Sequence, residues 1–263
     1  MPEFLPQINA GIDAYTVLML HMDGVDTCTH FLDSETTPKA VTAVGNAQID
    51  TAQSKFGNAS ALFDGAGDYL SVPDSDNWAF GATDWTIDFW FRLAGAPANY
   101  DGLFFQGAAG SWDNRHSLIL VNTSGTYSFS HELNVGAVSK WAFSYAANPN
   151  LSLNTWYHIT IIHVTATNTY YCYQNGVLLG SNVDADNVSD LAGAFLIGAA
   201  LGGSSEYLNG WIDEFRVSAG VARWTSAFTP PTIPYDVNNF YDLGMIGYNR
   251  WWKPMFDTGN LGL

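Results

Sequence analysis

The stretch GWIDEFRVSAGVARW, residues 210–224, mixes the aromatic and β-branched residues of a strand with charged side chains. In a β-strand, successive side chains point to opposite faces. One face then carries Trp211, Asp213, Phe215 and Val217. The other carries Ile212, Glu214 and Arg216, of which the last two are expected to pair with each other or with neighbours. Burying a carboxylate without a partner is costly, so we expect Asp213 to lie at a rim, to accept backbone hydrogen bonds or to bind a cation.

Segments of the same kind recur along the chain, separated by clusters of Gly, Asn, Asp and Pro. The expected strands are Thr16–His21, Ser60–Phe63, Tyr69–Val72, Thr86–Leu93, Leu103–Gln106, Ser117–Asn122, Tyr127–His131, Trp156–His163, Thr169–Gln174, Val177–Leu179, Ala194–Ile197 and Gly210–Val217. Short strands at such spacing are typical of an all-β sandwich or barrel. Asn175-Gly176 between two apolar runs predicts a hairpin, because both residues readily adopt positive φ.

The segment DWTIDFWFRL, residues 84–93, separates into two faces when it is written as a strand. One face is apolar and is predicted to lie in the core: Trp85, Ile87, Phe89 and Phe91. The other is polar with a single indole: Thr86, Asp88, Trp90 and Arg92. This division predicts a sheet with one face in the core and one face in water.

Composition narrows the range of functions. The chain has 263 residues and a formal net charge of −16, with 25 acidic against 9 basic residues. Nucleic acid is an unsuitable partner because its recognition requires a basic surface, and an anionic membrane surface is disfavoured for the same reason. Neither a signal peptide nor a membrane-spanning run is visible, and the chain is expected to be soluble. Cys28 and Cys172 are expected to be free thiols.

The two ends differ from the middle of the chain. Residues 1–14 are expected to form an N-terminal arm, residues 15–234 one β domain, and residues 235–263 an aromatic C-terminal tail. The tail can pack on its own domain, dock onto another subunit or be disordered. Aromatic residues are enriched at protein interfaces, which favours docking through Tyr241, Tyr248, Trp251, Trp252 and Phe256.

Several segments, taken in order, resemble one family. They are LMLHMDG (residues 18–24), the run from AQSKFG to DFWFRL (52–93), NTWYHITII (154–162), YYCYQNGVLLGS (170–181), the run from FLIGAA to GVARW (195–224) and FTPPT (228–232). Together they are similar to a laminin G-like domain of the concanavalin A-like jelly-roll superfamily, of the kind found in bacteriophage virion proteins. The resemblance implies an antiparallel jelly-roll β-sandwich of two sheets, one concave and one convex.

The resemblance also implies a calcium ion near the edge of the sandwich. On the matching positions, Asp23 and Asp213 would supply carboxylates, and Gly67 or Asp68 a backbone oxygen. Calcium takes six to eight oxygen ligands and tolerates irregular geometry. The alternative is that Asp213 accepts backbone N–H groups and holds two strands together.

Catalytic patterns are sparse. Some members of the superfamily hydrolyse β-glucans with carboxylates in an E-x-D-x-x-E pattern on one strand, whereas the matching strand here offers only Asp88. The glutamates of the whole chain are Glu3, Glu35, Glu132, Glu206 and Glu214, and none stands in that pattern. The sequence has no HExxH and no GxSxG, so we predict a protein without enzymatic activity.

Carbohydrate binding is the other activity weighed from the residues. Lectin-type sites stack aromatic rings on sugars, and three aromatic residues in expected loops are candidates: Tyr100, Trp112 and Trp141. The alternative for each is an ordinary loop aromatic residue covering an end of the sandwich.

The function expected from this resemblance is a non-catalytic virion surface protein, a capsid decoration or fibre-type component assembled in the host cytoplasm. Its partners would be a major capsid or tail protein, further copies of itself, or both. The alternative is a carbohydrate-binding adhesin module that recognises host surface glycans, and a glycan-cleaving enzyme with an unfamiliar site is a third class.

Overall fold

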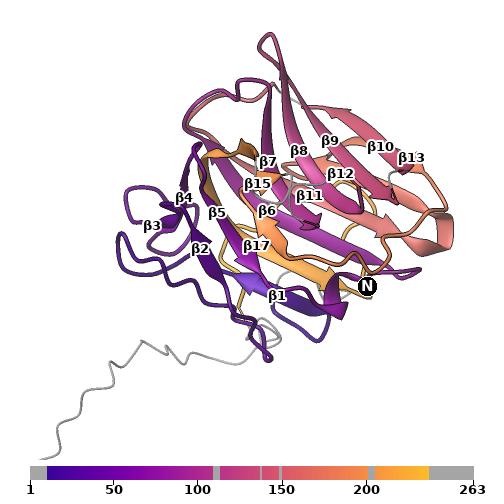
Figure 1. Cartoon of the computed structure of the whole chain (residues 1–263), viewed down its shortest axis with the longest axis horizontal. Helices are drawn as coiled ribbons and strands as arrows, with labels where there is room; N and C mark the ends of the chain where they lie inside the picture. Colours follow the sequence, from indigo (N-terminus) through magenta and orange to yellow (C-terminus); the bar gives the residue numbers. More distant parts are fainter. Residues whose placement is uncertain (1–10, 109–112, 137, 148–149, 201–204, 237–263) are drawn as a thin grey trace, which may run out of the picture.

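A computed structural model describes residues 11–236 apart from 109–112, 137, 148–149 and 201–204. Two large antiparallel sheets pack face to face (Figure 1). The eight-stranded sheet has the order β13 (Val177–Val183), β12 (Thr169–Gln174), β11 (Trp156–Val164), β6 (Trp85–Leu93), β17 (Asn209–Ala219), β4 (Ser60–Asp64) and β3 (Gln48–Asp50), and β1 (Thr16–Leu20) pairs with β17. The predicted all-β sandwich is therefore confirmed.

The seven-stranded sheet has the order β10 (Val138–Ala146), β9 (Thr126–Val135), β8 (Arg115–Thr123), β7 (Tyr100–Gly107), β14 (Phe195–Ile197), β5 (Tyr69–Val72) and β2 (Thr42–Val44). A small hairpin of β15 (Ala199–Ala200) and β16 (Ser205–Tyr207) lies beside β7. Two short 3-10 turns, Asp76–Trp78 and Thr165–Thr167, complete the regular structure of the described residues.

Every strand expected from the sequence is present, although most are a few residues longer. β2, β3, β10, β15 and β16 were not predicted. Between β12 and β13, the Asn175-Gly176 hairpin is confirmed, with φ of 51° and 74° at its two turn residues. Both cysteines are free, as expected.

The core lies between the two sheets and is built from inward-facing rows. β6 contributes the row predicted for it, since Trp85, Ile87 and Phe89 are all fully buried in the core cluster. From the seven-stranded sheet, β8 and β9 contribute Leu118 and Phe129, among others. Alternation along each strand therefore places one face of each sheet in the interior.

A β-bulge in β17 overturns the predicted faces of this strand. Asp213 lies opposite Trp90 of β6, whereas Arg216 lies opposite Asp88, so two residues of β17 face one residue of β6. Glu214, in the bulge, has a φ of 51°. Because a bulge shifts the alternation by one residue, Phe215 and Val217 point into the core while Trp211 and Asp213 point outward. The carboxylate therefore does not share a face with Phe215 and Val217.

The outer face of the eight-stranded sheet is covered, contrary to the prediction that it is wetted. Asp88 is fully buried and Trp90 is 5% exposed. Residues 55–56 pack on Trp90, with the Lys55 ammonium 3.9 Å from the indole centroid. Residues 222–228 pack on β11 and β12 through Trp224 and Phe228. Three chain segments, counting residues 11–13, thus form an outer layer on this sheet.

Residues near the two ends of the described chain meet on this covered face. Gly11 and Asp236 form a parallel bridge, and the amide of Ile12 donates to the carbonyl of Asp236 at 3.2 Å. Ile12, Met19 and Tyr235 form a small buried cluster beneath the bridge. The last residues of the predicted arm and the first of the predicted tail therefore pack on the domain, while residues 1–10 and 237–263 lie outside the described residues. No helix in the described ranges is long and apolar enough to span a membrane.

Candidate functional site

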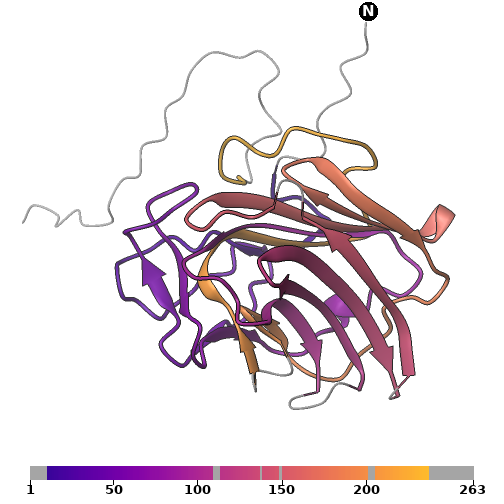
Figure 2. The same cartoon turned by 90° about the horizontal axis from the view of Figure 1, so that it is seen from above.

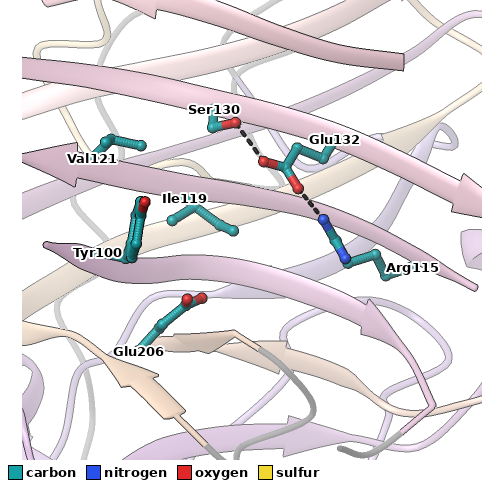
Figure 3. A pocket seen from close by; sticks show the side chains of 7 residues that line it. All are labelled: Tyr100, Arg115, Ile119, Val121, Ser130, Glu132 and Glu206. Carbon is teal, nitrogen blue, oxygen red and sulfur yellow. Dashed lines mark hydrogen bonds and ion pairs between the residues drawn. The ribbon is translucent and has the colours of Figure 1, made fainter. Parts of the chain in front are cut away.

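A pocket of about 560 Å³ lies on the outer face of the seven-stranded sheet, which the described residues do not cover in the same way. It forms because β8 and β9 alternate strictly. In β9, Phe129 and His131 point into the core, whereas Ser130 and Glu132 point outward into the pocket. Figure 3 shows the outward side chains of neighbouring strands converging on one hollow, with β16 closing its other side.

The apolar part of the pocket combines a floor with one exposed ring. Ile119 and Val121, both from β8, line it together with Tyr100 at the start of β7. The Tyr100 side chain is 50% exposed, so its ring is available to a ligand. Ile119 also joins a buried cluster beside the pocket with Phe105 and Leu196. This cluster fixes the floor beneath the ring.

On the polar side of the pocket, other side chains of the protein compensate the charge of Glu132. Arg115 donates to Glu132 Oε2 in a short ion pair, and the Ser130 hydroxyl donates to Glu132 Oε1 at 2.6 Å. Each oxygen of Glu132 therefore has a hydrogen-bond donor from the protein. Figure 3 shows this linked row of three side chains along one side of the pocket.

A second carboxylate, Glu206, lies across the pocket on β16 (Figure 3). Its backbone has a φ of 59°, a conformation that non-glycine residues rarely adopt and that is enriched at functional sites. Its Oε2 atom is buried and has no hydrogen-bond partner among the described residues. Burial raises the pKa of Glu206, repulsion from Glu132 raises it further, and Arg115 partly offsets both.

A third carboxyl lies beside Glu206, just outside the pocket lining. Asp101 is 4% exposed and accepts a hydrogen bond from the amide of Asn209 at 3.3 Å. Burial raises the pKa of Asp101 to about 7, and the neighbouring Glu206 contributes to the rise. This edge of the pocket is therefore rich in carboxyl groups.

The three predicted sugar-stacking residues have different outcomes. Tyr100 lies at the pocket, and Trp112 lies outside the described residues. Trp141 is not on a loop: it belongs to β10, is only 4% exposed, and stacks on Phe143 at 4.9 Å between centroids. The alternation of Trp141, Phe143 and Tyr145 predicts a strand, and this signal was missed.

The three charged residues of the pocket were not predicted from the sequence: Arg115, Glu132 and Glu206. For Arg115 and Glu132, the alternation along β8 and β9 was a usable signal for an outward face. Nothing local in the sequence pairs them with Glu206, which comes from a distant hairpin.

The predicted calcium ligands do not form one site. Asp68 Oδ1 accepts the amide of Asn46 at 2.5 Å and Oδ2 accepts that of Asp64 at 3.0 Å, which fixes the turn containing Gly67. Asp64 pairs with Asn209 at the start of β17. Asp213 lies four residues further along β17, or about 13 Å at ~3.3 Å per residue.

Asp213 and Asp23 instead hold one loop. Asp213 Oδ2 accepts the amides of Lys55 and Phe56 at 2.7 and 3.1 Å. Asp23 Oδ1 accepts the amides of Asn58 and Ala59 at 2.7 and 3.2 Å. These bonds match the alternative role considered for Asp213, a carboxylate that binds backbone N–H groups.

One oxygen of this arrangement remains without a protein donor. Asp213 Oδ1 is buried and has no hydrogen-bond partner within the described part of the chain. Burial raises the pKa of Asp213 to about 8 against the opposing effect of the two amides, so a proton on this carboxyl is favoured at neutral pH. No group of three or more His, Cys, Asp or Glu side chains in the described ranges could hold a metal ion.

We therefore expect removal of divalent cations to leave the melting temperature unchanged, because amides and a proton satisfy Asp213. Thermal unfolding with EDTA, and then with excess calcium, measures this directly. A calcium-dependent rise in melting temperature that Asp213→Asn abolishes would contradict the expectation and assign a cation to Oδ1. The same measurement tests the calcium site that the family resemblance implies.

The predicted interface residues Tyr241, Tyr248, Trp251, Trp252 and Phe256 lie outside the described residues. Their role in docking stays a prediction.

Comparison with known proteins places the fold. The protein family described as the concanavalin A-like lectin/glucanases superfamily matches residues 64–233. A search of curated proteins gives no match.

Among solved structures, domain 4 of AbnA, a GH43 extracellular arabinanase from Geobacillus stearothermophilus, in complex with arabinotriose, has a TM-score of 0.58 at 17% identity, over 81% of this chain and 95% of that one. The binding domain of botulinum neurotoxin serotype D has a TM-score of 0.57 at 16% identity, over 80% of this chain and 49% of that one. The binding domain of botulinum neurotoxin DC in complex with SialylT has a TM-score of 0.57 at 15% identity, with the same coverage. This chain thus spans about half of each neurotoxin chain, and at these identities the likeness concerns the fold.

Proposed function

Because the chain belongs to the laminin G-like family of the concanavalin A-like lectin/glucanases superfamily, we propose that it is a non-catalytic glycan-binding module. The observation that carries the proposal is the pocket on the seven-stranded sheet, where the half-exposed ring of Tyr100 lies beside an apolar floor and fixed polar groups. Ligand sites combine aromatic and apolar walls with a few placed polar groups. A sugar ring has the matching chemistry, since it offers C–H faces to an aromatic ring and hydroxyl groups to carboxylates.

The ligands of similar folds support this class. The arabinanase domain is a complex with arabinotriose, and one neurotoxin binding domain is a complex with SialylT. Both favour the glycan-binding alternative over a purely structural role. They identify no ligand for this chain, because the sequences have diverged too far.

The non-catalytic part of the proposal rests on the placement of carboxylates. Asp88 is the only carboxylate on the strand that matches the glucanase pattern, and it is fully buried under Arg216 and Tyr235. It therefore cannot contact a sugar. In the pocket, Glu132 is occupied by Arg115 and Ser130.

The place where the two ends of the described residues meet supports a role in display. Gly11 and Asp236 meet on the outer face of the eight-stranded sheet, whereas the pocket lies on the outer face of the other sheet. Figure 2 shows the strands of the two sheets as separate layers, with the yellow C-terminal end of the described chain above one of them. A module attached through both ends would keep its pocket directed away from the attachment point.

Whether that attachment point is on a virion stays a prediction. Capsid or tail partners, self-association and a place on the virion surface rest on the family resemblance, with residues 237–263 as the docking segment.

We expect Tyr100→Ala to lower glycan affinity about tenfold, a loss of ~1.4 kcal/mol, because it removes the exposed ring. Tyr100→Phe keeps the ring and is expected to keep most of the affinity. The measurement is a glycan-array screen followed by calorimetry with the best oligosaccharide.

Tyr15→Ala serves as the matched control, because Tyr15 is similarly exposed at 45% but lies outside the pocket lining. Equal binding by wild type and Tyr100→Ala would contradict this pocket as the site. Cleavage of the bound oligosaccharide would contradict the non-catalytic assignment.

A further inference from the structure

The charges in the pocket are unevenly compensated. Glu132 has an ion pair with Arg115 and a hydrogen bond from Ser130, so its charge is neutralised within the protein. Glu206 has a buried oxygen without a partner among the described residues. Counting formal charges, the lining holds two carboxylates against one guanidinium, which leaves one negative charge on the Glu206 side.

The surroundings of Glu206 strengthen this imbalance. Asp101 lies close enough that Glu206 adds to the rise in the pKa of Asp101, which burial mainly causes. The chain as a whole carries a net charge of −16, so its field also attracts cations and repels anions. A ligand with its own carboxylate would meet repulsion from Glu206.

The backbone of Glu206 indicates that its position is held at some cost. A φ of 59° is uncommon for a residue with a side chain, and such conformations persist where the surrounding structure imposes them. Glu206 has this conformation, and it is also the one lining carboxylate that the described protein groups do not neutralise.

We propose that the pocket is specific for amino sugars, with the carboxylate of Glu206 receiving a protonated amine while the ring of Tyr100 covers a face of the sugar. This inference rests on the proposed glycan-binding function and names the class of glycan. An ammonium group supplies both the positive charge and the hydrogen-bond donors that Glu206 lacks. Acidic sugars are excluded by the same charge. Binding would also favour the ionised form of Glu206, whose pKa is raised in the free protein.

The test compares two ligands that differ only in charge, oligomers of 2-amino-2-deoxyglucose and the same oligomers after N-acetylation. Calorimetry at low and high salt is expected to give at least tenfold tighter binding of the amino form at low salt. That preference should shrink at high salt, because salt screens ion pairs. Binding of the N-acetylated form should change little with salt.

Glu206→Gln keeps the size of the side chain and one acceptor oxygen and removes its charge. It is expected to abolish the preference for the amino form while leaving the weaker binding of the acetylated form. Asp26→Asn removes one charge at an exposed position outside the pocket lining and is expected to keep the preference. Melting curves confirm that each variant is folded.

The outcomes separate the two proposals. If the acetylated oligomers, or oligosaccharides of uronic acids, bind as well as the amino form and Tyr100→Ala weakens them, the amino-sugar assignment is wrong and the glycan site stands. If Glu206→Gln keeps the full preference, the assignment to Glu206 is wrong. If no glycan binds in a Tyr100-dependent way, the proposed function itself fails.

Discussion

Asp88→Ala is expected to lower the free energy of unfolding by about 3–5 kcal/mol, because it leaves the guanidinium of Arg216 buried without its counter-ion. Both side chains are fully buried. Arg216 Nε and Nη2 donate to the two oxygens of Asp88 at 3.0 and 3.2 Å, a bidentate pair. Urea denaturation monitored by tryptophan fluorescence measures the loss.

The pair also joins distant parts of the chain. Tyr235 donates its hydroxyl to Asp88, and its ring lies 3.7 Å from the guanidinium carbon of Arg216. Arg216 Nη1 donates to the carbonyl of Gly11 at 3.0 Å, and His158 Nε2 lies 3.4 Å from Asp88 Oδ2. Losing Asp88 is therefore expected to loosen the segments at Gly11 and Tyr235 from the sheet. Limited proteolysis should show earlier cleavage near residues 11 and 235.

The double variant Asp88→Leu/Arg216→Met is the control for this prediction. Replacing both members of a buried ion pair by apolar residues is often close to neutral, so we expect it to recover most of the loss. A single Asp88→Ala variant as stable as the wild type would show that the pair contributes nothing. The pair would then be incidental to the closure of the chain ends.

Stability is expected to reach a maximum close to pH 6.5. Burial raises the pKa of Asp213 to about 8 and that of Asp101 to about 7, above an ordinary value of 3.8. Between the ordinary pKa and these raised values, the folded state holds protons that the unfolded state has lost. Stability therefore falls as the pH rises toward 8. Each carboxyl contributes up to about 1.4 kcal/mol per pH unit.

Four buried histidines produce the opposite slope in acid. Burial lowers the pKa of His116 to about 3 and also lowers those of His131, His158 and His163 from 6.5. Below pH 6.5 the unfolded chain takes up protons that the folded chain cannot hold. Unfolding therefore takes up protons as the pH falls through the ordinary histidine range, and stability declines toward acid.

Two variants test the limbs of this profile separately. Asp213→Asn is expected to flatten the decline above pH 6.5, and His116→Gln to flatten the decline below it. Urea midpoints measured between pH 4 and pH 9 give the profile. Stability that rises steadily up to pH 9 would contradict the protonated state of Asp213 and Asp101 in the folded protein.

The two outer faces of the sandwich differ in what lies over their polar side chains. On the eight-stranded sheet, polar side chains such as Asp88 and Arg216 are buried beneath segments of the chain itself. On the seven-stranded sheet, outward side chains such as Glu132 remain at an open pocket. The polar residues of the first face stabilise closure of the domain, and those of the second remain available to a ligand.

The sequence by itself determined which segments are strands and which rows enter the core. Trp85, Ile87 and Phe89 could be assigned to the interior because alternation along a strand is a local property of the chain. The same reasoning failed over Gly210–Val217. A bulge in the pairing with β6 shifts the alternation between Asp213 and Arg216, and no local sequence pattern predicts it.

Only the tertiary structure decided what covers each sheet and which polar groups meet. Asp88 reads as an exposed strand residue, and its burial depends on Arg216 and Tyr235, which follow it by 128 and 147 positions. The pocket likewise unites Tyr100 with Glu206, from strands that are distant in the sequence. Alternation fixes the side of a sheet on which a residue lies. Whether that side meets water, a ligand or another part of the chain depends on long-range packing, because burial and electrostatics are set by neighbours in space.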